Sequence, residues 1–149
     1  MQPLRLNEFL PYRLSVLAAV VSEGLARSYG EQFGIGVPEW RVLATIGEFQ
    51  SITAKAIGAH AHMGKVKVSR AVASLEGRRL IRRTPNADDM REAFLVLTPA
   101  GATIYRRIVP MALGYAEALR GALSQDEAAM LDRLVDKLMA RAIAMPGPT

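Results

Sequence analysis

The sequence has no cysteine, only two histidines, and no apolar run long enough to cross a bilayer. Without cysteine there can be no disulfide, thiol redox switch, cysteine nucleophile or cysteine-based zinc site, and we expect a cytoplasmic protein. His60 and His62 alone are too few for a metal site, which needs three or four ligands, so we expect no metal and no cofactor. They could instead touch phosphate. The first residues also lack the basic and then apolar pattern of a secretion signal.

The 149 residues suit a single domain, and their charge is unevenly distributed. The net charge of +5 lies entirely in the middle of the chain, because residues 1–54 carry −1, residues 55–91 carry +6 and residues 92–149 are neutral. Such a concentrated basic segment is typical of a protein that binds a polyanion. A solvated basic face is the alternative interpretation.

Caps and apolar spacing predict three helices before residue 62. Asn7 is the expected N-cap of the first helix, Pro11 is tolerated in its first turn, and Gly34 and Gly36 end it. The expected helices cover residues 7–33, 38–49 and 53–61.

A fourth helix is predicted over residues 64–79. At 100° per residue, Val68, Val72 and Leu75 fall on one side of it. The opposite side and its flank carry Lys, Arg, Ser and Val but no acid, which is unusual for a helix that is merely solvated. These outward residues are Lys65, Val66, Lys67, Ser69, Arg70 and Ser74.

Two candidate strands follow, at 80–84 and 93–98, around the turn-forming loop 85–91. Thr98 and Pro99 form an N-cap and first position for a fifth helix, which runs toward Gly121 and is kinked or interrupted at Pro110. Ser124 and Glu127 have capping-box spacing, which starts a sixth helix over 125–143. This helix is too apolar to stand alone, so we expect the long helices to form a dimerisation layer.

The order of elements predicts a mainly α fold with a small β-hairpin wing, that is, a winged helix-turn-helix. In this arrangement the helix 64–79 enters the major groove of DNA and the hairpin is the wing. Arg70 is suited to a bidentate contact with guanine, while Arg82 and Arg83 at the wing are suited to phosphates.

The stretch "VSRAVASLEGRRLIRR…DDMREAFLVLTPAG" resembles the MarR family of winged-helix transcriptional regulators. Its most specific part is an Asp-x-Arg wing tip followed by an apolar strand and Leu-Thr-x-x-Gly. The resemblance implies that Arg91 reaches the minor groove while Asp89 orients it. Two positions depart from the family pattern, because Arg79 stands where glycine often ends the recognition helix and Met90 replaces a residue that is commonly basic.

The resemblance covers nearly the whole chain and implies one MarR-like domain over 1–149. In it, a DNA-binding lobe spans about 35–98, dimerisation helices span 7–33 and 99–143, and a flexible tail spans 145–149. The family forms dimers that bind palindromic operators. Its effector pocket lies between the first, second and fifth helices, where an arginine often holds a carboxylate.

The N-terminal segment resembles a subgroup that controls the catabolism of aromatic acids such as hydroxycinnamates, whose inducers are the acids or their coenzyme A thioesters. Arg13, with Tyr12 beside it, is therefore a ligand-binding candidate, although an ion pair with an acid is the alternative for Arg13. Trp40 is expected to be a core residue or a pocket wall.

We therefore expect a dimeric, sequence-specific DNA-binding regulator, a repressor released by a small aromatic effector. Two rivals are an architectural DNA-binding protein without sequence preference or ligand, and a protein-binding adaptor on the same scaffold. An enzyme is not expected, because the sequence shows no nucleotide fingerprint and no Ser-His-Asp order.

Overall fold

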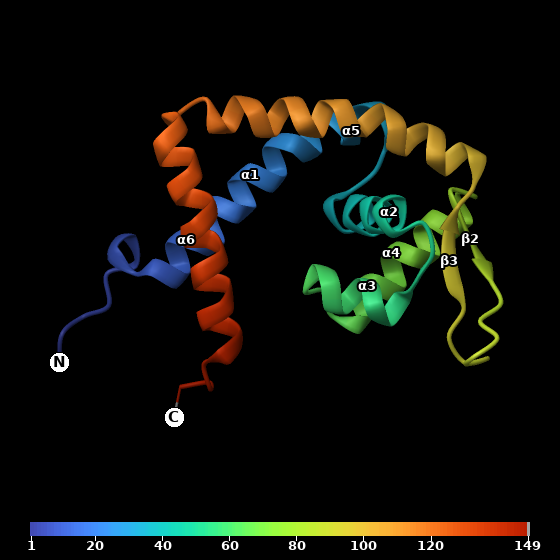
Figure 1. The fold of residues 1–149 in the computed structure, drawn as a ribbon, viewed down its shortest axis with the longest axis horizontal. Coiled ribbons are helices and arrows are strands. Elements are labelled where there is room, and N and C mark those ends of the chain that lie inside the picture. Colours follow the sequence, from blue (N-terminus) through green and yellow to red (C-terminus); the bar gives the residue numbers. More distant parts are fainter. Residues whose placement is uncertain (149) are drawn as a thin grey trace. The chain divides into compact units, whose positions relative to one another are not determined.

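A computed structural model describes residues 1–148 and confirms a mainly helical fold with a small antiparallel sheet (Figure 1). Thr149, the last residue of the predicted tail, lies outside the described residues. No helix in the described part of the chain is long and apolar enough to span a membrane. The elements are α1 (Leu10–Phe33), α2 (Val37–Phe49), β1 (Ile52–Thr53), α3 (Ala54–Ala61), α4 (Lys65–Gly77), β2 (Ile81–Thr84), β3 (Phe94–Leu97), α5 (Pro99–Arg120) and α6 (Gln125–Ala144).

The chain divides into two compact units, one of residues 1–111 and one beginning at Ala112, so the boundary falls inside α5. All buried apolar residues lie in the first unit, whereas none of the described residues from 112 to 148 is buried. The second unit therefore has no hydrophobic core of its own. The largest fully buried side chains are Tyr29, Leu43, Ile46, Ile57, Leu75, Leu95 and Ile108.

The predicted start of the first helix is wrong by three residues. Asn7 belongs to a short 3-10 turn, Leu6–Glu8, and α1 begins at Leu10 with Phe9 as its N-cap. The prediction for its end is confirmed, because Gly34 adopts a left-handed conformation (φ 64°) and its N–H bonds to Gly30 O.

The sheet has one more strand than the predicted hairpin. Strand β1 contains only Ile52 and Thr53, and it pairs with the outer edge of β3, so the order is β1-β3-β2. Two residues are too few to show an alternating pattern, which is why the sequence did not reveal this strand. Because β1 follows α2 directly and pairs with β3, it joins the end of α2 to the hairpin. Thr53 is also the N-cap of α3, and its hydroxyl accepts the Ala56 N–H at 3.1 Å.

Helices α5 and α6 follow the predicted caps. The Ser124 hydroxyl accepts the Glu127 N–H at 3.1 Å, and the Glu127 carboxylate accepts the Ser124 N–H at 2.9 Å. Pro110 does not interrupt α5, which is one continuous helix. Within the second unit, Arg120 donates two hydrogen bonds to Asp132 at 2.8 and 3.1 Å, and these lower the pKa of that carboxyl group.

Candidate nucleic-acid interface

Helix α4 separates its apolar and polar residues onto two faces. Val68, Ala71, Val72 and Leu75 are buried against the rest of the first unit. The outward residues Lys65, Val66, Lys67, Ser69 and Arg70 are exposed, as their sequence positions predicted. No hydrogen bond or ion pair from their side chains to another described residue is found, so three cations stand on this face without a carboxylate to neutralise them.

The turn between α3 and α4 is fixed by its backbone. His62 caps the end of α3 in a left-handed conformation (φ 51°), and the Met63 N–H bonds to Gly58 O at 3.0 Å. His60 is exposed and lies edge-on to the Phe49 ring, with 5.0 Å between ring centres. No group of three His, Cys, Asp or Glu side chains within residues 1–148 could hold a metal ion.

Ser74 is exposed on α4, but its hydroxyl is already engaged. It donates to the Glu39 carboxylate at 2.6 Å, and the same carboxylate accepts the Gly36 N–H at the start of α2 at 3.1 Å. One turn further, Arg78 donates to the carbonyls of Phe33 and Gly34 at 2.6 and 3.2 Å. These bonds fix α4 to the α1–α2 junction. The three-residue spacing of Gly36 and Glu39 could have indicated a cap, whereas no local signal indicated Arg78.

The wing strands β2 and β3 pair antiparallel, with Arg82 opposite Val96 and Arg83 opposite Leu95. The two predicted phosphate ligands differ. Arg83 donates to both oxygens of Glu76 at 2.9–3.1 Å, which joins the wing to α4. Arg82 is exposed, and the described residues offer it no hydrogen-bonding partner.

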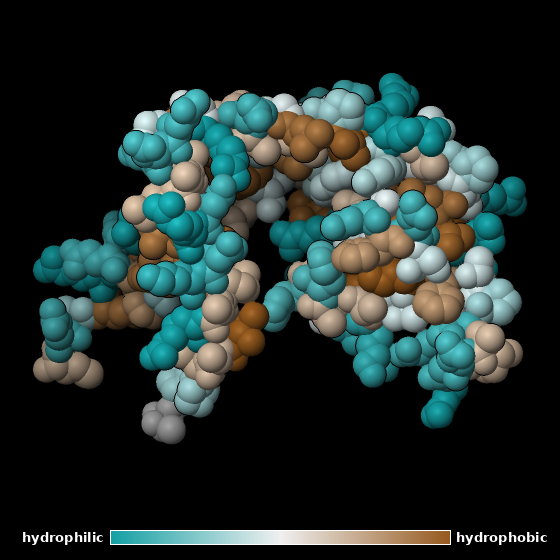
Figure 2. All heavy atoms as spheres, viewed as in Figure 1, coloured by the Kyte–Doolittle hydropathy of each residue, from teal (hydrophilic) through white to brown (hydrophobic). Residues whose placement is uncertain are grey.

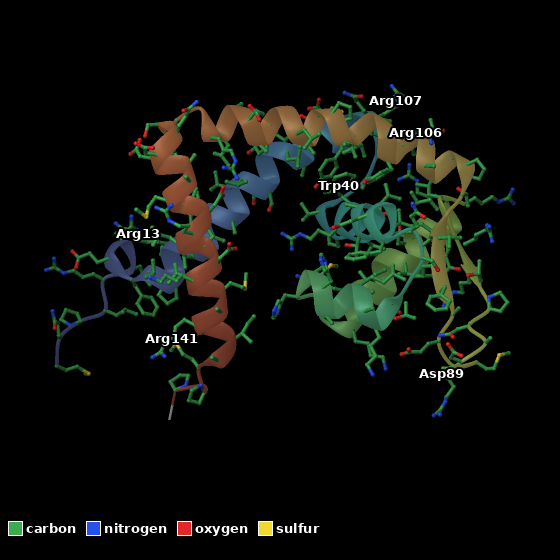
Figure 3. All side chains as sticks on the ribbon, in the orientation of Figure 1. Arg13, Trp40, Asp89, Arg106, Arg107 and Arg141 are labelled. Atoms are coloured by element: carbon green, nitrogen blue, oxygen red, sulfur yellow. The ribbon has the colours of Figure 1, made fainter. Side chains whose placement is uncertain are left out.

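The wing tip is built around Asn86, whose residue type alone predicts only a turn. Asn86 is buried, and its side-chain oxygen accepts the N–H groups of Asp88 and Asp89 at 3.1 and 3.3 Å. Asp89 in turn accepts the Arg91 N–H at 2.9 Å and lies 3.6 Å from Arg91 Nε. The aspartate and arginine of the tip are thus in contact, and Figure 3 shows Asp89 at the free end of the hairpin.

Arg79 ends α4 in a way that glycine usually does. Its φ is +58°, its N–H bonds to Glu76 O, and the Leu80 N–H bonds to Leu75 O, which together form a Schellman cap. Gly77 is the last helical residue, and Arg79 takes the left-handed position without being glycine, so the departure from the family pattern does not change how the helix ends.

The Leu-Thr-x-x-Gly motif joins the wing to α5. The Thr98 hydroxyl donates to Arg79 O at 2.7 Å and accepts the Gly101 N–H at 3.1 Å, which confirms the predicted cap. A Cβ on Gly101 would collide with the Leu80 carbonyl, so only glycine lets α5 pass this close to the end of α4. The motif therefore fixes the wing, α4 and the start of α5 together.

The three predicted ligand residues do not come together within one chain. Trp40 packs between Tyr29 and Tyr105, with ring centres 5.7 and 6.4 Å apart, at the junction of α1, α2 and α5. Tyr12 and Arg13 lie at the other end of α1. Tyr12 is seventeen residues before Tyr29, or about 25 Å at 1.5 Å per residue, and Figure 3 shows Arg13 far from Trp40.

Arg13 is exposed and has no acidic partner among the described residues, so the ion pair considered for it does not form within the chain. Burial raises the pKa of the Tyr29 hydroxyl, and the positive charge of Arg41 partly opposes this. Gly47 gives Tyr105 room, because a Cβ there would clash with the Tyr105 ring. The aromatic cluster is thus a packed junction of three helices.

Comparison with known proteins places this architecture in one family. A sequence profile described as the MarR family matches residues 33–92, which include α2 to α4 and the wing tip. The transcriptional regulator HosA of Escherichia coli O157:H7 is 30% identical over 102 residues, or 68% of this chain and 76% of that protein.

Solved structures show the same fold over almost the whole chain. A MarR/EmrR family transcriptional regulator from Acinetobacter sp. ADP1 has a TM-score of 0.87 at 23% identity, covering 95% of this chain and 100% of that one. The MepR–DNA complex from S. aureus has a TM-score of 0.82 at 19% identity, covering 90% and 98%. The chain therefore belongs to the MarR family, the winged-helix DNA-binding transcriptional regulators.

Proposed function

We propose that the protein is a homodimeric repressor that places the α4 helix of each subunit in the major groove of a palindromic operator. The observation that carries this proposal is the outward face of α4, where Lys65, Lys67 and Arg70 are exposed with no carboxylate beside them. Unpaired cations on a helix that fits the groove gain phosphate and guanine contacts without breaking internal bonds.

Not every predicted contact is equally available to DNA. Ser69, Val66 and Arg82 are exposed without competing bonds. The S. aureus MepR structure, which shares the fold, was solved as a complex with DNA. Ser74 and Arg83 would have to give up their bonds to Glu39 and Glu76 before contacting DNA. We therefore assign base recognition to the first half of α4, and the wing contact to Arg82 and Arg91, with Asp89 orienting Arg91.

Exposed apolar surface supports the dimer. Five large apolar side chains of α6 are 43–50% exposed: Met130, Leu131, Leu134, Val135 and Leu138. No described residue from 112 to 148 is buried, so nothing within this unit covers them. In Figure 2 the face of α6 turned to the viewer is mostly hydrophilic, and hydrophobic side chains show at the edge of its lower end. A second copy of the chain is the partner that would cover this face in every molecule, and a two-fold axis would set the two α4 helices against half-sites about 10 bp apart.

For the effector we propose an aromatic carboxylic acid or its coenzyme A thioester, bound beside Trp40. Trp40 and Tyr105 are half-buried at the junction of α1, α2 and α5, so part of each ring is accessible beside the buried Tyr29. Arg13 and Tyr12 can join this site only from a second subunit. An effector releases DNA when it binds better to a dimer whose α4 spacing no longer fits the operator.

The proposal is tested by selecting an operator from random duplex DNA and titrating it by fluorescence anisotropy. A sequence-specific regulator should bind the selected duplex about 10³-fold or more tightly than random DNA at physiological salt. A ratio near one would instead indicate an architectural DNA-binding protein. A complete lack of salt-dependent affinity would indicate a protein-binding adaptor, because phosphate contacts release counterions.

The same titration tests the effector. Adding aromatic acids or their thioesters should weaken operator binding, and the Arg13→Ala variant should keep operator affinity but lose this response. If Arg13→Ala responds like the wild type, Arg13 has no part in effector binding.

A further inference from the structure

Only three large apolar side chains are exposed among residues 34–111, the stretch from the end of α1 through the wing to the first half of α5. One of them, Phe49, is packed against the ring of His60. The other two are Val66, 62% exposed, and Met90, 84% exposed. They lie on the outward face of α4 and at the tip of the wing, so both are on the elements assigned to DNA.

Met90 is held on a fixed turn. The side-chain oxygen of Asn86 accepts two backbone N–H groups, and the Asp89 carboxylate accepts the Arg91 N–H. The Glu92 N–H bonds to Asp89 O at 3.2 Å, which closes a turn with Met90 and Arg91 at its centre. Within this turn Met90 is 84% exposed and the Arg91 side chain 94% exposed, although their backbone is held. Met90 is therefore presented in advance of binding.

The charge of the tip argues against a purely electrostatic contact. Asp88, Asp89 and Glu92 supply three carboxylates against the single guanidinium of Arg91. A segment with an excess of two negative charges gains little from phosphates, which it would repel as a whole. If the tip touches DNA, the contact has to come from the Arg91 head group and the apolar Met90 side chain.

We propose that Met90 enters the minor groove beside Arg91 and selects against G·C pairs there. In that groove a G·C pair presents the guanine N2 amino donor, while an A·T pair has the adenine C2–H at the same place. An apolar thioether packs against C2–H and the sugar walls, but it leaves a buried amino donor without an acceptor. This inference rests on the proposed function, because it assumes that the hairpin is a DNA-binding wing.

The test uses the duplex selected for the wild-type protein, with each A·T pair outside the α4 contacts replaced in turn by G·C or by inosine·cytosine. Inosine keeps the major-groove edge of guanine but lacks its N2 amino group. At the pair under the wing, wild-type affinity should fall about tenfold for G·C and change little for inosine·cytosine. The Met90→Ala variant should lose most of this difference.

Salt dependence separates the apolar contact from a charged one. Met90→Ala should weaken binding roughly fivefold without changing the slope of log K against log salt, whereas Arg91→Ala should make that slope shallower by about one. Met90→Leu should behave like the wild type. Because Met90 and Arg91 are both exposed, all three variants should unfold at the wild-type temperature, which calorimetry verifies.

Two results would overturn the inference in distinguishable ways. If Arg91→Ala weakens binding but Met90→Ala keeps the full G·C penalty, the wing binds DNA and Met90 has no part in selecting the base pair. If neither variant changes affinity, the hairpin is not at the DNA, and the wing component of the proposed function fails together with this inference.

Discussion

At the scale of single residues, Arg79 is the costliest position in the turn that connects the recognition helix to the wing. A side chain with a Cβ in the left-handed conformation costs roughly 1–2 kcal/mol, and glycine avoids that cost. The turn persists because its surroundings fix it, since the Arg79 carbonyl accepts the Thr98 hydroxyl and Leu80 is buried behind it.

Replacing Arg79 with glycine should therefore raise the free energy of unfolding by about 1 kcal/mol, the cost of the left-handed conformation less the added entropy of the unfolded chain. Chemical denaturation would measure it. The matched control is Ala73→Gly on the exposed side of α4, which should lose about 1 kcal/mol because its conformation is helical. An equal loss in both variants would show that Arg79 is not strained.

At the scale of elements, the sequence predicted helices accurately where a cap marked their ends. Thr98 and Ser124 each accept a backbone N–H from three residues further on, and both helices begin where these caps predict. Asn7 has the right chemistry for a cap but none of its bonds, so α1 starts three residues later. The residue type of a possible cap therefore does not fix the start of a helix by itself, because the side chain must also form its bond to the following turn.

Contacts between elements were the part that the sequence did not reveal. Ser74 and Arg83 fall on faces that pattern alone assigns to DNA, yet each meets a carboxylate brought close by the fold, 35 and 7 residues away along the chain. Within the wing, the residue types of the loop 85–91 predicted a turn. They did not predict that the Asn86 side chain would be buried and would bind the backbone of the tip. The residues on the outward face of α4 were predictable, because the 100° step between successive helical residues decides which side chains face away from the core.

Helix α6 carries the clearest prediction at this scale. Leu134→Lys places a charge in the centre of its exposed apolar face, so it should shift the protein from about twice the 16.2 kDa chain mass toward the mass of a single chain. Light scattering after gel filtration would measure this. Asp136→Lys adds the same side chain to the polar face of α6 and should stay dimeric. A wild-type protein that runs as a single chain would contradict the proposed dimer.

At the scale of the whole molecule, the net positive charge and the buried core both lie in the first unit, whereas most exposed large apolar side chains lie near the two ends of the chain, in residues 1–20 and 113–145. The net positive charge is concentrated in residues 55–91, the buried core is confined to the first unit, and residues 112–148 contribute no buried residue. The second unit, which contributes no buried residue, is the part that the proposed dimer would cover. We propose that a DNA-binding lobe of 35–98 and dimerisation helices of 7–33 and 99–143 work together in this way.

In the proposed complex, the outward face of α4 recognises base sequence, and this recognition depends most on Arg70. The decisive measurement is the affinity of Arg70→Ala for the selected operator and for all its single-base-pair variants. We predict a loss of roughly 1–3 kcal/mol on the operator, with discrimination relaxed at one base pair per half-site. An equal loss on every variant and on random DNA would mean that Arg70 touches only phosphate and that this face of α4 does not read base sequence through it.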